Sequence, residues 1–496
     1  MFRPWMTLLI IVMVYIPVAI DATVLHVAAP TLSMALGVTG QQLLWIIDIY
    51  PLMMAGLVLP MGALGDRIGF KRLLILGGAL FGLASLAAGL ANSAITLIGA
   101  RALLAFGAAM IVPATLAGIR HSFSRQQDRN LALGIWAAVG SGGAACGPLI
   151  GGWLLEHFYW GSVFLVNVPI VITVLCLTAY WVPSAPQNRQ RQLNLSHALM
   201  LTTAILLLIS GIKGGLKEGA GWLTLATASG GALLLYGFIR LQRRSRSPLL
   251  DLSLFGHRVI LSGVIMATTA MIALVGFELL MAQELQFVHG LTPLAAGMFM
   301  LPVMLASGFS GPIAGLLVSR LGLRRVATGG MALSALSFAG LAMTDFASQH
   351  WLAWGWMALL GFSAASALLA GTSAIMAAAP KEKAASAGAI ETMAYELGAG
   401  MGIALFGLLL GRSYGASIEL PPGLSGEQAH MAASSIGEAA QVAHQADPAF
   451  GEAVMAAAQQ AFISAHGLVL ASAAAMLLIL AITIGFSLKG AEPAAD

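Results

Sequence analysis

The sequence predicts an all-α integral membrane protein, and three observations support this fold class. Apolar residues make up 59% of the 496 residues. The chain carries 24 basic and 20 acidic residues, whereas a soluble protein of this length would carry about 124 charges. The apolar residues also occur in long runs that are separated by short polar breaks. Because a spanning helix needs about 20 apolar residues, the composition is sufficient for roughly fourteen spans.

The apolar runs predict the fourteen spans in order, each ending at a polar break. The first six cover residues 6–35, 42–64, 72–92, 94–119, 131–155 and 161–182. A polar linker follows, and the next two cover 196–213 and 221–241. The last six cover 257–285, 291–318, 324–345, 351–379, 384–410 and 460–487. The Ala-rich segment 411–460 precedes the last span and is predicted to form short helices outside the membrane.

Basic residues predict the orientation of these spans. An even number of spans places both termini on one side of the membrane. Twenty of the 24 Lys and Arg residues lie in the N-terminal segment or in the alternate loops that follow it. Lys213, Lys217 and Arg412 lie on the opposite side, and Arg101 lies within a span. By the positive-inside rule, both termini are cytoplasmic.

A repeated loop motif predicts two parallel halves. The segment Gly62-Ala-Leu-Gly-Asp-Arg-Ile-Gly-Phe-Lys-Arg72 returns 253 residues later as Gly315-Leu-Leu-Val-Ser-Arg-Leu-Gly-Leu-Arg-Arg325. Both copies follow an even-numbered span into the cytoplasm, so the halves are related as parallel repeats. The predicted plan is a six-helix bundle at 1–182, a linker with two inserted spans at 183–256, and a second six-helix bundle at 257–496 with an external loop at 411–460.

Ionisable residues inside the predicted spans are functional candidates, because a charge at the bilayer centre costs about 2.5 to 3.5 kcal/mol. Asp21 lies near the middle of the first span and is the candidate proton carrier, since a carboxyl group at this depth can bind and release a proton. Arg101 in the fourth span needs a counter-anion, and Asp21 is the candidate. His26 is either a hydrogen-bonded packing residue or a proton relay.

The second span contains a pattern that suits an organic cation. Asp48 lies close to Trp45 and Tyr50 in the sequence, and an anion beside aromatic faces attracts a positively charged ligand. We therefore interpret these three residues as a substrate-binding group. The alternative for Asp48 is a structural role, with its carboxylate hydrogen-bonded near the membrane interface.

Further carboxylates lie in the ninth and thirteenth spans. Glu391 and Glu396 are five residues apart, which is about 140° around a helix, so they cannot both face one cavity directly. Glu391 and Tyr395 share a helix face and are predicted to bind substrate together, with Glu391 also a candidate for proton coupling. Glu396 serves either substrate or helix packing. Glu278 belongs either to the substrate site or to a face that is simply exposed to the lumen. For Glu391 and Glu396, the alternative is a purely structural role in hydrogen bonding.

The fifth span is rich in small residues, and the chain lacks the common nucleotide and metal motifs. The fifth-span stretch Gly147-Pro148-Leu-Ile-Gly151-Gly152 allows close helix contact and a kink at Pro148. The sequence contains no Gly-Lys dipeptide for a P-loop and no HExxH metal motif. Its two cysteines lie inside apolar stretches. We therefore expect no enzyme, no cofactor, no metal site, and neither ATP nor nucleic acid as a partner.

At these motifs the sequence resembles the major facilitator superfamily over essentially the whole chain. The loop motif and its copy, the segment Arg101–Gly107 and the segment Gly147–Gly152 are similar to patterns of that superfamily. The segments Asp21–Pro30 and Trp160–Pro169 resemble its fourteen-span drug:proton antiporter branch. The resemblance implies the major facilitator fold and the export of lipophilic organic cations in exchange for protons.

The resemblance also implies roles for single residues. Asp21 and Asp48 match acidic positions of the branch's quaternary ammonium pumps, and Arg101 matches its helix 4 arginine. Glu391 and Glu396 match the acidic pair of the thirteenth span. Positions that match motifs controlling conformation are Gly62, Asp66, Arg67, Gly69, Lys71, Arg72, Gly147, Pro148, Gly151, Gly152, Arg320 and Arg324. Ser319 replaces the acid of the second loop copy, so the implied cytoplasmic latch has its acid in the first half only.

The predicted function is therefore proton-coupled multidrug efflux by alternating access. The implied substrates are lipophilic cations such as quaternary ammonium compounds, biguanide and bis-pyridinium antiseptics, methyl viologen and dyes. The implied partners are protons and the lipid bilayer, and we expect a monomer in the bacterial inner (plasma) membrane. The alternatives are an exporter of an endogenous metabolite and a non-transporting membrane sensor.

Overall fold

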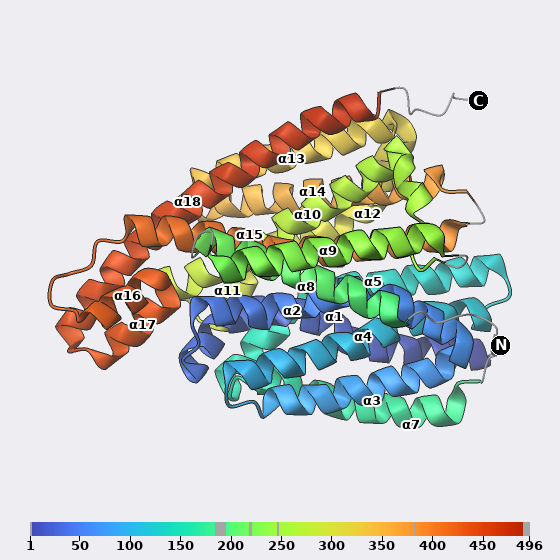
Figure 1. Cartoon of the computed structure of the whole chain (residues 1–496), viewed down its shortest axis with the longest axis horizontal. Coiled ribbons are helices and arrows are strands. Elements are labelled where there is room, and N and C mark those ends of the chain that lie inside the picture. Colours follow the sequence, from blue (N-terminus) through green and yellow to red (C-terminus); the bar gives the residue numbers. More distant parts are fainter. Residues whose placement is uncertain (1, 184–194, 218–220, 246–247, 381–382, 490–496) are drawn as a thin grey trace. The chain divides into compact units, whose positions relative to one another are not determined.

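The computed structural model describes residues 2–183, 195–217, 221–245, 248–380 and 383–489, and all regular elements in these ranges are helices (Figure 1). In chain order they are α1 (Phe2–Leu36), α2 (Gly40–Ile68), α3 (Phe70–Gly89), α4 (Ala94–Ser122), α5 (Gln126–His157), α6 (Ser162–Leu165), α7 (Asn167–Trp181), α8 (Leu195–Lys217), α9 (Trp222–Arg244), η1 (Leu252–Gly256), α10 (Arg258–Gln283), η2 (Glu284–Val288), α11 (Pro293–Phe299), α12 (Leu301–Leu321), α13 (Leu323–Ala342), α14 (His350–Ala378), α15 (Ala384–Ser417), α16 (Gly426–Ser434), α17 (Ile436–Gln445) and α18 (Pro448–Ser487).

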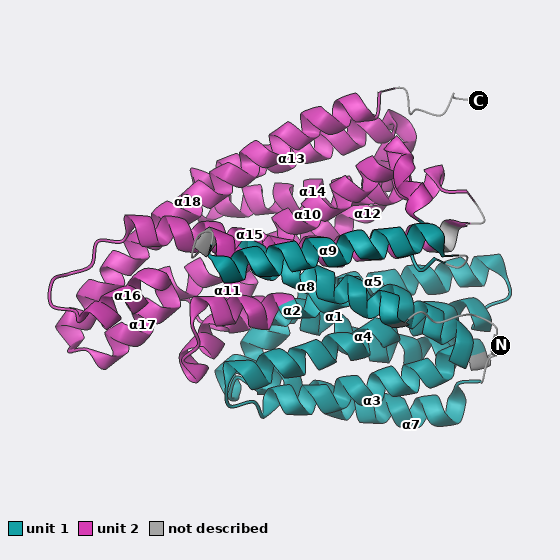
Figure 2. Ribbon diagram, viewed as in Figure 1, with its two compact units in different colours: residues 1–25, 49–212, 220–251 teal, residues 26–48, 213–219, 252–496 magenta. Residues whose placement is uncertain are grey.

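The chain divides into two compact units, which Figure 2 shows in different colours. Unit 1 consists of Met1–Leu25, Ile49–Ile212 and Ala220–Asp251, and unit 2 consists of His26–Asp48, Lys213–Gly219 and Leu252–Asp496. Helices α1, α2 and α8 therefore contribute residues to both units. The predicted linker at 183–256 includes residues 184–194, 218–220 and 246–247, which lie outside the described part of the chain.

Close helix packing inside each unit depends on glycine. In unit 1, α3 packs against α4 and α7, and a side chain at Gly107 would lie 2.8 Å from the backbone nitrogen of Phe81. In unit 2, α10 packs against α14 and α15, and α13 packs against α14 and α18. There Gly263 and Gly371 face each other so closely that a Cβ on either would lie within 3 Å of the other's carbonyl oxygen. Small residues at helix crossings let the backbones approach, as is typical of membrane helices.

The number of membrane spans stays a prediction. Within the described ranges, 13 helices are long and apolar enough to cross a membrane. Helix α13, which corresponds to the predicted span 324–345, is not among them, because its 20 residues include Arg324, Arg325 and many small polar residues. It nevertheless packs along α14 and α18 as part of unit 2 (Figure 1).

Two predicted spans are interrupted where proline lacks a backbone N–H. The predicted span 161–182 consists of α6 and α7, and the missing N–H of Pro169 leaves the carbonyl of Leu165 without its helical donor. The predicted span 291–318 consists of α11 and α12, where Pro302 has the same effect on the carbonyl of Met298. A span predicted from an apolar run does not show such a break, because the prediction uses only apolar content and not backbone hydrogen bonding.

The predicted short helices between the last two spans are present as α16 and α17. Ser425 caps α16 in a capping box with Gln428, and the Ser435 hydroxyl caps α17. The flanking helices are longer than predicted, because α15 continues to Ser417 and α18 begins at Pro448. Figure 1 shows α16 and α17 beside the C-terminal end of α15 and the N-terminal end of α18.

The repeated loop motif has the same backbone geometry in both units. Gly69 precedes α3 with φ of 89°, and Gly322, 253 residues later, precedes α13 with φ of 81°. With ψ of 144° and 155°, both residues occupy a region that is essentially restricted to glycine. The sequence repeat therefore marks a repeated tight connection between helices.

The repeat also extends to a side-chain contact. Lys71 donates from Nζ to the carbonyl of Ala179 at the end of α7, at 2.9 Å. Arg324, the residue equivalent to Lys71, donates from Nε to the carbonyl of Gly485 at the end of α18, at 2.8 Å. A cation at a helix C-terminus is stabilised by the last carbonyls and the helix dipole. Each copy thus joins the third helix of its bundle to the sixth.

We predict that Gly69→Ala lowers the stability of unit 1. A non-glycine residue in this conformation costs about 1 to 3 kcal/mol. Gly99→Ala is the matched control, since a Cβ at this α4 position meets no atom within 4 Å and alanine is favoured over glycine in a helix. Thermal unfolding of the detergent-purified proteins should show a lower midpoint for Gly69→Ala only. Equal midpoints for the two variants would contradict the prediction.

Candidate functional site

Unit 1 contains a buried ion pair near the middle of α1. Arg101 on α4 donates from Nη1 to Oδ2 of Asp21 at 2.5 Å, and both side chains are at most 1% exposed. The counter-anion that the sequence predicts for Arg101 is therefore present. The guanidinium carbon of Arg101 also lies 4.6 Å from the centre of the Tyr50 ring. The second oxygen of Asp21, Oδ1, has no hydrogen-bonding partner among the described residues.

The small-residue stretch of α5 brings this helix against α1 on both sides of Asp21. A side chain at Gly143 would meet Ala19, and a side chain at Gly151 would meet Val24. Between them, a Cβ at Gly147 would overlap the hydroxyl of Thr23. The spacing of four residues thus places one glycine at each turn of the contact, as close packing requires.

Proline in α5 creates a second link between the same helices. Pro148 has no N–H, so the carbonyl of Ala144 lacks its usual helical donor. The Thr23 hydroxyl donates to that carbonyl at 2.8 Å. This bond satisfies a partly buried acceptor, and it holds α1 in register two residues from Asp21.

Unit 2 contains a second buried ion pair, which the sequence analysis did not predict. The sequence predicts Lys213 at the outer end of the span 196–213. In the structure it is 1% exposed, and its Nζ lies 2.5 Å from Oδ2 of Asp48. The same Nζ lies 3.9 Å from the centre of the Trp45 ring. Asp48 and Trp45 thus contact a cation together, and that cation is a lysine of the chain itself. Sequence analysis missed this residue because a lysine near the end of a span usually reaches the interface.

Tyr50, which the sequence predicts to act with Asp48 and Trp45, contacts a different cation from theirs. Tyr50 belongs to unit 1 and faces Arg101, whereas Asp48 and Trp45 belong to unit 2 and face Lys213. Each of the two rings therefore contacts a cation of the chain itself. Neighbouring positions in a helix point in different directions, which a linear motif does not display.

Glu278 and His26 form a pair in unit 2. Nδ1 of His26 lies 3.0 Å from Oε2 of Glu278, and the histidine is buried while the glutamate is 15% exposed. A second contact lies next to this pair: the Gln286 side chain donates to the carbonyl of Val27, the residue after His26, at 2.9 Å. The histidine and the glutamate are 252 residues apart, so no local sequence pattern pairs them.

The predicted pair of Glu391 and Tyr395 is part of a three-residue network in unit 2. The Tyr395 hydroxyl and the Thr372 hydroxyl each donate to Oε1 of Glu391 at 2.6 Å. Thr372 comes from α14, so sequence analysis of α15 could not reveal it. Glu396 lies five residues further along α15 and has no ionic or hydrogen-bonding partner among the described residues. The two glutamates of α15 therefore occupy different environments, as their spacing predicts.

A further buried carboxylate, Glu284, lies at the end of α10 beside two histidines. Glu284 is 3% exposed and contacts Nδ1 of His466 on α18, and Nε2 of His289 lies 3.6 Å from its other oxygen. The cluster joins η2 to α18. Across the described residues, no group of three or more His, Cys, Asp and Glu side chains has the arrangement of a metal site.

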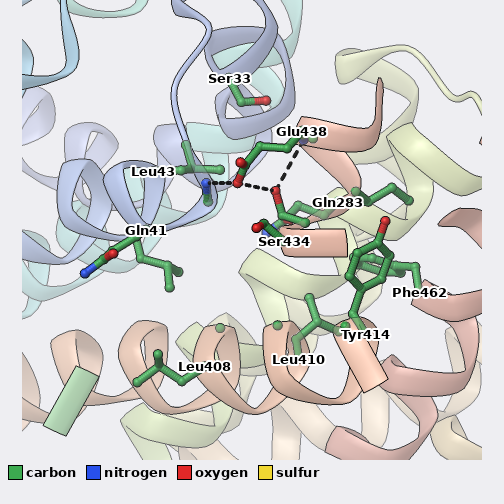
Figure 3. A pocket seen from close by; sticks show the side chains of 18 of the residues that line it. Ser33, Gln41, Leu43, Gln283, Leu408, Leu410, Tyr414, Ser434, Glu438 and Phe462 are labelled. Atoms are coloured by element: carbon green, nitrogen blue, oxygen red, sulfur yellow. Dashed lines mark hydrogen bonds between the residues drawn. The ribbon is translucent and has the colours of Figure 1, made fainter. Parts of the chain in front are cut away.

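Unit 2 also encloses a cavity of about 280 Å³. Its apolar lining includes Leu43, Leu410 and Phe462, and Lys213 is part of the wall. Figure 3 shows Glu438 at one edge, where the carboxylate accepts a hydrogen bond from the backbone nitrogen of Gly40 at 2.9 Å. A carboxylate at this position stabilises the first turn of α2. The segment between α15 and α18 thus closes one side of the cavity.

The remaining motif residues lie at helix ends or in the α5 contact. Asp66, Arg67 and Arg72 are exposed around the connection between α2 and α3. Arg320 is exposed at the end of α12, in the second copy of the motif. Gly62 faces Pro113, with 3.6 Å between a Cβ built there and the proline Cβ. Gly152, next to Gly151 in α5, is buried.

The helical architecture, the buried charge pairs and the repeated motif define a membrane transporter. Residues 11–403 match the model of the Major Facilitator Superfamily, so the chain belongs to this family, and it is a transporter rather than an enzyme. A solved structure of a bacterial homologue of the human lysosomal transporter Spinster, inward-facing and unoccupied, has the same fold. It superposes with a TM-score of 0.70 at 16% identity, covering 100% of this chain and 99% of that one.

Two relatives narrow the class to multidrug efflux pumps of this family. The chain is 69% identical over 493 residues to the methyl viologen resistance protein SmvA of Salmonella typhimurium (strain LT2), covering 99% of this chain and 100% of the relative. It is 34% identical over 487 residues to the multidrug efflux pump LfrA of Mycolicibacterium smegmatis, covering 98% and 97%. The protein is thus a multi-pass membrane transporter.

We predict that Gly147→Ala disrupts the contact of α1 with α5. The added Cβ overlaps the Thr23 hydroxyl and displaces α1 next to Asp21. Gly142→Ala in the same helix is the matched control, because a Cβ there meets no atom within 4 Å. Efflux in cells with equal protein levels should fall at least about tenfold for Gly147→Ala, as a small misplacement of catalytic groups can cost more than this. Full activity of Gly147→Ala would refute the proposed contact.

Proposed function

We propose that the protein is a proton-coupled antiporter that exports lipophilic organic cations across the bacterial inner membrane by alternating access. The buried pair of Asp21 and Arg101 is the observation that carries this proposal. One relative is named for resistance to methyl viologen, an organic dication, and another is named a multidrug efflux pump. These names support the same substrate class for this chain.

Asp21 is the group that we assign to the proton. When it is ionised, Arg101 neutralises it at 2.5 Å, so the pair carries no net charge in the apolar interior. When Asp21 binds a proton, Arg101 loses this counter-anion. Protonation therefore changes the contact between α1 and α4, and such a change can bias one transporter conformation over another. Glu391, held by two hydroxyl donors, is the second group that we assign to coupling.

Carboxylates of unit 2 are the groups that we assign to the substrate. Glu391 with Tyr395 presents an anion beside an aromatic ring, and this combination attracts organic cations. Glu396 and Glu278 add negative charge in the same unit. Asp48 with Trp45 supplies a further site of this kind, and Tyr50 supplies a ring in unit 1. Several carboxylates allow the protein to accept cations that carry one or two charges.

We assign the balance of inward-facing and outward-facing states to the loop motifs and to α5. Asp66 and Arg67 end α2 in the first copy, and Arg320 ends α12 in the second. Ser319 takes the place of Asp66 in the second copy, so the acid of this latch lies in the first half only. Pro148 with its flanking glycines supplies the hinge.

The proposal includes the predicted topology. The fourteen spans are arranged as six, two and six, in the segments 1–182, 183–256 and 257–496, with both termini in the cytoplasm. The protein works as a monomer and is driven by the proton gradient.

We predict that Asp21→Asn abolishes proton-driven efflux, because the amide cannot take up or release a proton. Proteoliposomes with an imposed pH gradient provide the measurement, with ethidium as the transported cation. Asp345→Asn, at an exposed aspartate, is the matched control and should keep normal transport. If Asp21→Asn protein that is correctly inserted still responds to the pH gradient, Asp21 is not the proton carrier.

We predict that Glu391→Gln weakens binding of the dication methyl viologen by about tenfold, which corresponds to 1.4 kcal/mol. The monocation tetraphenylphosphonium should lose less affinity, since it needs one carboxylate rather than two. Tyr395→Phe is the control that keeps the carboxylate and removes one hydroxyl donor to it, and its effect on dications should be smaller. Equal losses for the two ligands in Glu391→Gln would assign Glu391 a structural role. Binding to the purified proteins measures all of these effects.

A further inference from the structure

Lys213 is a cation that the protein itself places in a cation site. Its ammonium nitrogen lies 2.5 Å from the Asp48 carboxylate and 3.9 Å from the centre of the Trp45 ring. Lys213 is 1% exposed, and Asp48 is fully buried. All three residues belong to unit 2. A carboxylate and an aromatic face are also the groups that bind organic cations.

The position of Lys213 in the chain makes this arrangement informative. It lies near the end of α8, one of the two helices between the repeated halves. A lysine near the end of a membrane helix usually extends toward the interface, because a buried ammonium is costly. The attraction of Asp48 and Trp45 offsets this cost. The same attraction is available to any other cation that reaches the site.

The cavity of unit 2 supplies the route to this site. Lys213 is part of the cavity wall, whereas Asp48 and Trp45 are not among the residues that line it. A ligand in the cavity therefore meets Lys213 before Asp48. The volume of about 280 Å³ is close to the lower bound of about 300 Å³ for small-molecule pockets. The apolar lining by Leu43, Leu410 and Phe462 suits the hydrocarbon part of a lipophilic cation.

We propose that Lys213 is a tethered competitor for the substrate cation: an organic cation entering the cavity binds Asp48 and Trp45 only by displacing the lysine. This inference rests on the proposed function, in that it concerns the binding of exported cations. It makes Lys213 a determinant of specificity. A weakly bound or strongly hydrated cation cannot displace the lysine, whereas a lipophilic cation with a good fit can.

The first test is equilibrium binding of radiolabelled tetraphenylphosphonium to purified protein at a single pH. Lys213→Gln removes the competing charge and keeps a polar side chain of similar length. If the lysine occupies Asp48 in more than about nine-tenths of the molecules, its removal lowers the apparent dissociation constant by about tenfold or more. Lys213→Arg keeps the charge and is the matched control, so its dissociation constant should stay near that of the wild-type protein.

Two further variants show whether the gain depends on Asp48. Asp48→Asn should weaken binding, and Asp48→Asn combined with Lys213→Gln should bind as weakly as Asp48→Asn alone. This cycle isolates the coupling between the two positions. Unchanged or weaker binding in folded Lys213→Gln overturns the proposal and makes the pair structural. An equal gain in the presence of Asp48→Asn overturns it as well.

A measurement on the wild-type protein covers the case in which Lys213→Gln does not fold. Acetylation of lysine amines by a water-soluble succinimidyl ester is followed by mass spectrometry. Saturating tetraphenylphosphonium should raise the acetylation rate of Lys213 several-fold, because the displaced ammonium leaves its carboxylate, while exposed Lys489 serves as the unaffected control. An unchanged rate at Lys213 overturns the proposal.

These experiments separate the inference from the proposed function. If the wild-type protein binds the cation and Asp48→Asn weakens binding, but Lys213→Gln does not strengthen it, only the role of Lys213 is refuted. If the wild-type protein binds neither tetraphenylphosphonium nor methyl viologen, the proposed substrate class is refuted, and the tethered competitor with it.

Discussion

The cost of burying charge among apolar helices determines how the polar residues of this transporter are arranged. Arg101 and Lys213 are both buried, and each lies 2.5 Å from an aspartate and close to an aromatic ring. Removing one partner of such a pair costs about 3 to 5 kcal/mol, since it leaves a buried charge without compensation. Each pair therefore holds its helices together, α1 with α4 in unit 1 and α2 with α8 in unit 2. The same dependence is the physical basis of the proposed response of the first pair to a proton and of the second pair to a competing cation.

The packing of α5 against α1 helps to position Asp21 in its pair with Arg101. Glycine at Gly143, Gly147 and Gly151 allows the two backbones to approach. Pro148 removes a helical donor, and Thr23 replaces it by donating to the freed carbonyl. The contact thus combines close approach with a specific hydrogen bond, so the position of Asp21 is coupled to the shape of α5. This is a physical reason for the small-residue stretch of α5 to lie beside the buried carboxylate of α1.

Equivalent positions of the two halves perform the same structural task with different side chains. Gly69 and Gly322 both take positive φ, and Lys71 and Arg324 both donate to a carbonyl at the end of a helix. Unit 2 carries an additional element in the segment of α16 and α17, which closes one side of the cavity and caps α2 through Glu438. The repeat therefore accounts for the connections between helices, while the cavity depends on residues that have no counterpart in the first half.

The sequence by itself determined the fold class, the family, the positions of the long helices and the buried residues that need partners. Hydropathy and charge are properties of short segments, and a carboxylate at mid-span is costly whatever surrounds it. The sequence also predicted Asp21 as the partner of Arg101, but only the tertiary structure decided the partners of the other charges. Lys213 with Asp48, His26 with Glu278 and Thr372 with Glu391 join different helices, and Tyr50 faces Arg101 instead of Asp48. Such contacts depend on the rotation and packing of whole helices, and no local pattern specifies these.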